Sequence, residues 1–188
     1  MKKNSLIQVF HVPYFFIVIC VMPLLLVANF LPAHANGEVY LWIDGFLDGY
    51  LFGQVGFWSS SFPFSSKVSS NYISIFGPFF AAIALRKSCR GVFIDPEQYH
   101  GLTLKKYAFA LVVFLAFLGM FFSINYFESI DLVMHNFKFR RFGLNSTLYS
   151  LFVSSMFLSF YGVALCGYFA FFYVPGLLIK RYRAAREE

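Results

Sequence analysis

The side chains best suited to chemistry are scattered along this 188-residue chain. No two of its four histidines are spaced to place metal ligands on one helix face. They are His11, His34, His100 and His135. The chain has no glycine-rich phosphate loop with its lysine and no paired carboxylates inside an apolar stretch. We therefore expect no catalytic residues, no metal site and no cofactor, and the protein is not predicted to be an enzyme.

A second group of residues suits binding. Gly45, Gly49 and Gly53 recur every four residues, with Asp44 and Asp48 beside them. On a helix these glycines would form a smooth stripe that lets another backbone approach closely. Aromatic residues between them are typical of the belt at the headgroup level of a membrane. The segment is either an interfacial helix that covers a bundle, a face that docks a partner, or an irregular loop, since glycine opposes helix in water.

A third group alternates aromatic and basic residues between Phe137 and Phe142, where Lys138, Arg140 and Arg141 supply the charge. One interpretation is that the bases snorkel between rings that rest on the membrane. The other is a docking edge for an acidic partner or for lipid headgroups.

Composition decides which elements must position these groups. The chain is 59% hydrophobic and 13% charged, with 28 phenylalanines and a mean hydropathy of +0.66. A soluble domain is nearer half apolar and a quarter charged. We therefore expect an all-α polytopic membrane protein, with residues 1–188 forming one membrane domain and no disordered or disulfide-rich part.

Four apolar stretches approach the roughly 20 residues that a spanning helix needs. They cover about 12–31, 68–85, 107–126 and 148–179. The predicted fold is a four-transmembrane-helix bundle with outer loops at 32–67 and 127–147 and a cytoplasmic loop at 86–106. The last stretch exceeds a bilayer's thickness, so we expect tilt, or a break near Pro175-Gly176.

Charge predicts the orientation. Of the 15 Lys and Arg, eleven fall in the two terminal tails and the 86–106 loop, and four fall in the other two loops. Both termini are therefore expected in the cytoplasm. The net charge of +6 follows from this topology, and we expect no nucleic-acid partner.

The N-terminus has a second interpretation. Lys2-Lys3, an apolar stretch and Ala33-His34-Ala35 are typical of a cleaved secretory signal. The apolar stretch is longer than most signal cores and contains Pro23, so we expect the first helix to be retained.

The predicted spans carry no ionisable side chain at membrane depth, although pumps and proton-coupled carriers need one. Ser154, Ser155 and Ser159, with Gly162 and Gly167, are typical of helix packing rather than of a transport path.

With this plan in view, the chain resembles the immunity proteins of A-type pore-forming colicins. The resemblance covers nearly the whole chain and rests on diffuse, mostly apolar features. These are Met22-Pro23-Leu24-Leu25, Ser66-Lys67-Val68, Pro78-Phe79-Phe80-Ala81, Asn125-Tyr126-Phe127-Glu128, Arg140-Arg141, Asn145, Val174-Pro175 and Leu178-Ile179-Lys180-Arg181. It implies a bacterial inner-membrane protein with four spans and cytoplasmic termini, which holds the pore-forming domain of a colicin shut.

Such a binder needs no active site. Its partners would be the lipid bilayer and a pore-forming toxin domain or another membrane protein. Discrimination between toxins would come from outer charges. The candidates are Asp44, Asp48, Glu128, Asp131, Lys138, Arg140 and Arg141. A conjugation or secretion-associated subunit of the entry-exclusion type, or a small carrier or channel, stays open as an alternative.

Overall fold

The computed structural model describes residues 11–90 and 101–187 and is almost entirely helical in these ranges, as the sequence predicts. The helices are α1 (Tyr14–Phe30), α2 (Glu38–Tyr50), α3 (Pro63–Ser88), α4 (Leu104–Tyr126), α5 (Phe137–Leu144), α6 (Ser146–Tyr168) and α7 (Val174–Glu187). A π-helical turn, η1 (Phe169–Tyr173), joins α6 to α7. Two short strands, β1 (Gly56–Trp58) and β2 (Ser129–Asp131), were not expected.

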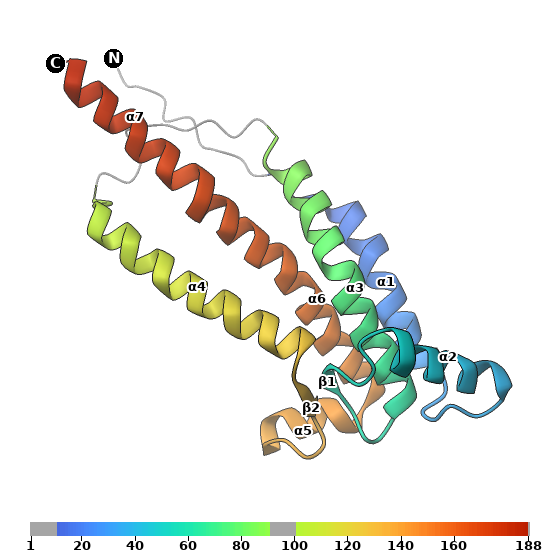
Figure 1. Cartoon of the computed structure of the whole chain (residues 1–188). Coiled ribbons are helices and arrows are strands. Elements are labelled where there is room, and N and C mark those ends of the chain that lie inside the picture. The colour runs from blue at the N-terminus through green and yellow to red at the C-terminus, as the bar shows by residue number, and fades with distance from the viewer. Residues whose placement is uncertain (1–10, 91–100, 188) are drawn as a thin grey trace.

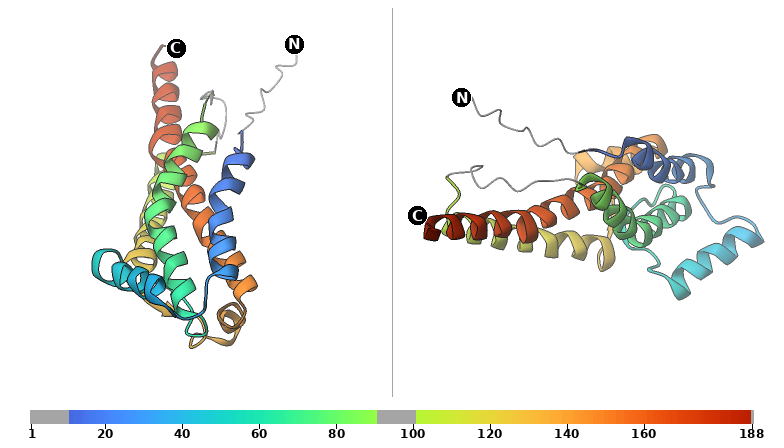
Figure 2. Two further views of the ribbon diagram at one scale, coloured as in Figure 1. Left: turned by 90° about the vertical axis from the view of Figure 1, so that its right-hand side faces the viewer. Right: turned by 90° about the horizontal axis from the view of Figure 1, so that it is seen from above.

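The long helices lie side by side in an elongated bundle (Figures 1 and 2). α3 and α6 form its centre, α1 packs against both, and α4 lies against α3 on the other side. α2, α5 and the two strands gather at one end, which we call the loop end (Figure 1). The other end holds the start of α1, the end of α3, the start of α4 and the end of α7, and we call it the terminal end.

Three helices are long and apolar enough to cross a membrane: Pro63–Ser88, Leu104–Tyr126 and the continuous helix Ser146–Arg183. The first predicted span corresponds to α1, an apolar helix of 17 residues that is shorter than these. The structure therefore supports a membrane protein with three spanning helices, and the fourth span stays a prediction. α1 is nevertheless part of the bundle, because Leu24 and Ala28 are buried against its neighbours.

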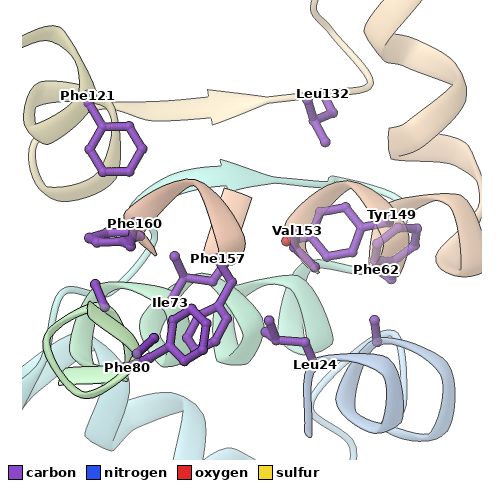
Figure 3. Close-up of a cluster of buried hydrophobic side chains, with 13 residues drawn as sticks. Leu24, Phe62, Ile73, Phe80, Phe121, Leu132, Tyr149, Val153, Phe157 and Phe160 are labelled. Atoms are coloured by element: carbon purple, nitrogen blue, oxygen red, sulfur yellow. The ribbon is translucent and has the colours of Figure 1, made fainter. Parts of the chain in front are cut away.

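Aromatic rings dominate the core where α3, α4 and α6 meet (Figure 3). Phe80 stacks on Phe157 with ring centroids 4.5 Å apart, and Phe121 meets Phe160 edge-on at 4.7 Å. The close approach of α3 and α6 depends on Gly77, because a Cβ there would lie 2.9 Å from the Phe160 ring. The core thus brings together residues from predicted spans two, three and four.

The break considered near Pro175-Gly176 does not occur, because Ser146–Arg183 is one continuous helix. A π-helical turn, η1, ends two residues before Pro175. Proline has no backbone N–H and its ring crowds the carbonyl four residues earlier. The wider π turn accommodates both effects without ending the helix. In this turn the carbonyl of Ala170 accepts a hydrogen bond from the Tyr107 hydroxyl at 2.9 Å, which connects α4 to η1.

The strands join the two loop-end segments. β1 and β2 pair in parallel, with Phe57 opposite Ile130. The Tyr149 hydroxyl, fully buried on α6, donates to the carbonyl of Phe57 at 2.9 Å and so ties this pair to the bundle. The loop end is therefore a folded layer rather than two independent loops.

Candidate partner-binding surface

α2 is attached to α3 by an ion cluster that we call the Lys67 cluster, formed by Lys67, Asp44 and Asp48. The Lys67 Nζ lies 2.7 Å from Asp44 Oδ1 and 3.0 Å from Asp48 Oδ2. The two carboxylates are four residues apart and so share one face of α2. Lys67 is 8% exposed, which makes it a buried cation that both acids neutralise.

The helix that contains Lys67 begins before the predicted second span. The sequence places Lys67 in the outer loop before a span at 68–85, but α3 begins at Pro63 and includes it. Proline suits the first turn of a helix because that turn leaves its N–H groups unbonded. The polar side chains that follow are buried because they face neighbouring elements instead of lipid. They are Ser65, Ser66, Ser69, Ser70, Asn71 and Ser74.

This buried polar face of α3 orders the chain between α2 and β1. The Asn71 side-chain amide donates to the carbonyl of Gly53 at 2.7 Å, and its oxygen accepts from the backbone N–H of Phe52 at 3.1 Å. Ser66 accepts from the backbone N–H of Ser59 at 3.1 Å. These residues were not predicted from the sequence, although Ser66, Ser70 and Ser74 recur at helical spacing.

The glycine stripe is shorter than predicted. Gly45 and Gly49 lie in α2, and among the described residues no atom outside the helix backbone lies within 4 Å of a Cβ built at either position. Gly53 follows the helix in the left-handed region, with φ +59°, and a Cβ there would lie 3.2 Å from Asp48 Oδ1. Its role is therefore to turn the chain beneath the Lys67 cluster, while Gly45 and Gly49 leave open surface on α2.

The opposite face of α2 carries an exposed row of rings, Trp42, Phe46 and Tyr50. Each is four residues from the next, and the ring centroids are 5.7 Å and 5.4 Å apart in stacked geometry. Trp42 is 69% exposed and Tyr50 is 80% exposed. Exposed stacked aromatics at the end of a spanning bundle suit contact with a membrane interface or with another protein.

α5 presents the basic group, which we call the α5 cations: Lys138, Arg140 and Arg141. Its first turn is capped by Asn136, whose side chain accepts the backbone N–H of Phe139 at 3.4 Å. The buried side of α5 places Phe139 and Phe142 against Phe152 of α6.

The α5 cations are all exposed, and within residues 11–90 and 101–187 none has an acidic partner within 4 Å. The guanidinium of Arg141 lies 5.4 Å from the centroid of the Phe137 ring. A fixed cation without a counter-ion is available to an acidic ligand.

Gly143 fixes the position of α5. A Cβ at this residue would lie 2.8 Å from the backbone nitrogen of Val133, so the helix approaches the chain after β2 as closely as glycine allows. The Gly143 carbonyl also accepts a hydrogen bond from the Ser59 hydroxyl. The sequence offered no local signal for this contact, because its partners lie 10 and 84 residues away.

The structure does not bring the predicted site residues into one cluster. α2 and α5 lie on different sides of the loop end (Figures 1 and 2). Asp131 is also occupied, since its carboxylate accepts the backbone N–H groups of Val133 at 3.0 Å and Ser60 at 3.2 Å. Glu128 accepts from the Ser123 hydroxyl at 2.9 Å. Of the charges proposed for recognition, only the α5 cations therefore lack a polar partner among the described residues.

An apolar groove of about 340 Å³ runs between α3, α4 and α6. Its lining combines phenylalanine rings with small residues, which are Ala81, Ala82, Ala164 and Gly167. The groove opens at the depth of the spanning segments. Small residues permit close helix packing in a membrane, so this groove can accept an apolar helix.

Within the described part of the chain, no group of three or more His, Cys, Asp or Glu side chains could hold a metal ion. Comparison with protein-family models, with curated proteins and with solved structures finds no match. The site must therefore be interpreted from its own geometry.

Proposed function

We propose that this protein is an inner-membrane immunity protein that binds the pore-forming domain of a cognate colicin and prevents its channel from opening. The observation that carries the proposal is the set of α5 cations, three exposed charges held without counter-ions on a helix that Gly143 locks to the bundle. Exposed charges that have no ion-pair partner among the described residues, on a helix held against the bundle, suit recognition of a partner that itself lies at the membrane surface.

Binding would use two kinds of contact. The groove between α3, α4 and α6 would accept apolar helix of the toxin at membrane depth, where small residues allow close packing. Such contacts discriminate poorly because apolar helices resemble one another. The α5 cations would supply the discrimination by pairing with acidic side chains of the cognate toxin.

The proposal includes the predicted topology, with the loop end outside the cytoplasm and both termini inside. Fusions of a periplasm-active and a cytoplasm-active reporter at Glu38, Cys89, Phe137 and after residue 188 should report outside, inside, outside and inside. An outside signal after residue 188 would exclude this topology and would turn the groove and the α5 cations the wrong way for an incoming toxin.

The decisive experiment is survival of cells that express the chain when they are challenged with a panel of A-type pore-forming colicins. Protection against one member and not the others is expected. The charge reversal Arg140→Glu with Arg141→Glu should abolish protection at unchanged protein level in the membrane. A mispaired charge at a partly buried contact costs a few kcal/mol, which is on the order of a hundredfold in affinity.

Two controls make the result specific. Arg140→Lys with Arg141→Lys keeps the charge and should retain protection. Lys105→Gln with Lys106→Gln removes two exposed charges at the terminal end and should also retain it. Full protection by the Glu variant would remove α5 from the recognition surface. If cells that express the wild-type chain survive none of the colicins, the proposal is refuted and the entry-exclusion type of subunit is favoured.

A further inference from the structure

The terminal end contains a cavity of about 920 Å³ between the start of α1 and the end of α3. Residues 11–16 and Ile19 form one wall, and Lys87 and Arg90 form the other. Ligand pockets in proteins commonly enclose about 300–1,000 Å³, so the space is large enough for a small molecule or for part of a lipid. Neither the α5 cations nor the groove between α3, α4 and α6 contributes to it.

The two walls differ in chemistry. On α1, Phe15 is 80% exposed and Ile19 is 53% exposed, which leaves an apolar surface that the described residues do not cover. On α3, the Lys87 ammonium lies 4.7 Å from the centroid of the Phe16 ring. Arg90 is exposed, and no residue of the described lining is acidic. An apolar wall beside two cations that have no acidic neighbour in the described lining matches a molecule with an anionic head and a hydrocarbon tail.

The lengths of the two helices explain why the space exists. α1 has 17 residues and rises about 25 Å, whereas the hydrocarbon core of a bilayer is about 30 Å thick. α3 has 26 residues and rises about 39 Å, and its end lies beyond the start of α1 (Figures 1 and 2). The cavity therefore lies where the apolar core of the membrane meets the headgroups, beside the last turn of α3. A short helix at this depth leaves a hydrophobic mismatch that lipid must fill.

We propose that this cavity is a binding site for one anionic phospholipid. Its phosphate interacts with Lys87 and Arg90, and its acyl chain lies along Phe15 and Ile19. Charge complementarity distinguishes this occupant from a zwitterionic lipid, whose own cationic headgroup would oppose the two bases. The bound lipid would fill the space that α1 leaves and so support α1 against α3. This inference does not depend on the proposed recognition of a toxin.

The test is a titration of the purified full-length protein in detergent, followed by native mass spectrometry. The ligands are phosphatidylglycerol, phosphatidylcholine with the same acyl chains, and inorganic phosphate. One phosphatidylglycerol molecule should remain bound at concentrations where phosphatidylcholine does not. Phosphate alone should neither bind nor displace the lipid, because it lacks the tail. Displacement by phosphate would show a simple anion site and overturn the proposal.

Three variants locate the site. Lys87→Gln with Arg90→Gln should weaken binding by about 25-fold, because each Lys or Arg near an anionic surface contributes roughly fivefold. Ile19→Trp keeps both charges and places a bulkier side chain where the acyl chain is proposed to lie, and it should weaken binding as well. Arg90→Gln alone, at a side chain with no described protein contact, guards against loss of folding and should weaken binding about fivefold.

The matched control is Lys105→Gln with Lys106→Gln, which removes two exposed charges at the start of α4 outside the cavity. It should bind phosphatidylglycerol within twofold of the wild type. Equal losses in this control and in the Lys87 and Arg90 variant would show diffuse electrostatic attraction and refute the site. Colicin survival is scored separately, so a failure of the lipid site is distinguishable from a failure of the immunity proposal.

Discussion

Removing the two carboxylates of the Lys67 cluster should detach α2 from the bundle. In Asp44→Asn with Asp48→Asn the Lys67 ammonium keeps its place beneath α2 and loses both counter-ions at 2.7 Å and 3.0 Å. A buried charge without a partner is strongly destabilising, by about 3–5 kcal/mol. The lysine can regain water only if α2 moves away, so the cost falls on the docking of α2.

Little else holds α2 in place. Leu47 is its buried apolar residue, and full burial of a leucine contributes about 1.5–3 kcal/mol. Tyr40 adds an edge contact with Phe64, with centroids 5.6 Å apart, which contributes about 0.5–1.5 kcal/mol. A loss of about 3 kcal/mol is therefore comparable to the free energy of these remaining contacts of α2. It changes the docking equilibrium on the order of a hundredfold.

Lys67→Met should do less harm than the double Asn variant. Asp44 and Asp48 keep side-chain exposures of 30% and 54%, so both carboxylates can rehydrate without movement of α2. Replacement of a buried charge by an apolar side chain of similar volume is often tolerated. We expect the free energy of docking of α2 to change by about 1 kcal/mol, which is about fivefold in the docking equilibrium.

Hydrogen exchange of the full chain in detergent, read by mass spectrometry, measures the docking directly. Amides of residues 38–50 should exchange about a hundredfold faster in the double Asn variant, while those of α4 and α6 stay unchanged. Glu38→Gln removes an exposed charge from the first turn of the same helix and is the matched control. The reasoning is wrong if the double Asn variant exchanges no faster than Glu38→Gln, or if Lys67→Met is the more damaging change.

Two further predictions concern packing and a thiol. Gly143→Ala should lower the free energy of unfolding by about 1–3 kcal/mol, because its Cβ would lie 2.8 Å from the Val133 backbone nitrogen. Gly49→Ala faces open space and should not lower it, so equal melting temperatures of the two variants would contradict the contact at Gly143. Burial raises the pKa of the Cys89 thiol, and the thiolate is the reactive form. In Cys20→Ser with Cys166→Ser the rate of alkylation should therefore keep rising above about pH 10, where an exposed thiol is almost fully ionised. A plateau by about pH 9.5 would contradict the burial of Cys89.

The long helices could be predicted because their signal is local. The uncharged run at 107–126 corresponds to α4, which adds one turn at its start. The helix of the glycine segment could also be anticipated, since aromatic and acidic residues alternate there at helical spacing. The end of this helix could not be predicted, because Gly53 lies outside it and its carbonyl accepts a hydrogen bond from Asn71, which is 18 residues away in the sequence.

The binding surface could be predicted only in part, because its charges depend on tertiary partners. From the sequence alone, Asp44 and Arg140 are both predicted to be charged residues in outer loops, and nothing distinguishes which of them is free to bind a partner. In the structure Asp44 neutralises a buried lysine 23 positions away, and Arg140 faces outward without an ion-pair partner among the described residues. Lys67 lies inside α3 with two carboxylates around its ammonium, so its charge alone did not indicate where the helix begins. Three-residue strands that pair in parallel leave no periodic pattern to detect.

The pairing of β1 with β2 also determines how late in synthesis the loop end can finish folding. The contacts that complete the loop end join partners such as Gly56 with Ser129 and Phe57 with Tyr149, the latter 92 positions apart. At a translation rate of about 5–20 residues per second, the first segment waits about 5–18 s for its partners. During that interval β1 and Ser59 are synthesised without their partners in β2, α5 and α6, whereas α2 can already pair with Lys67 of α3. A ribosome that stalls before α6 therefore leaves a fragment with an incomplete loop end, and only a chain that extends through α6 can complete it.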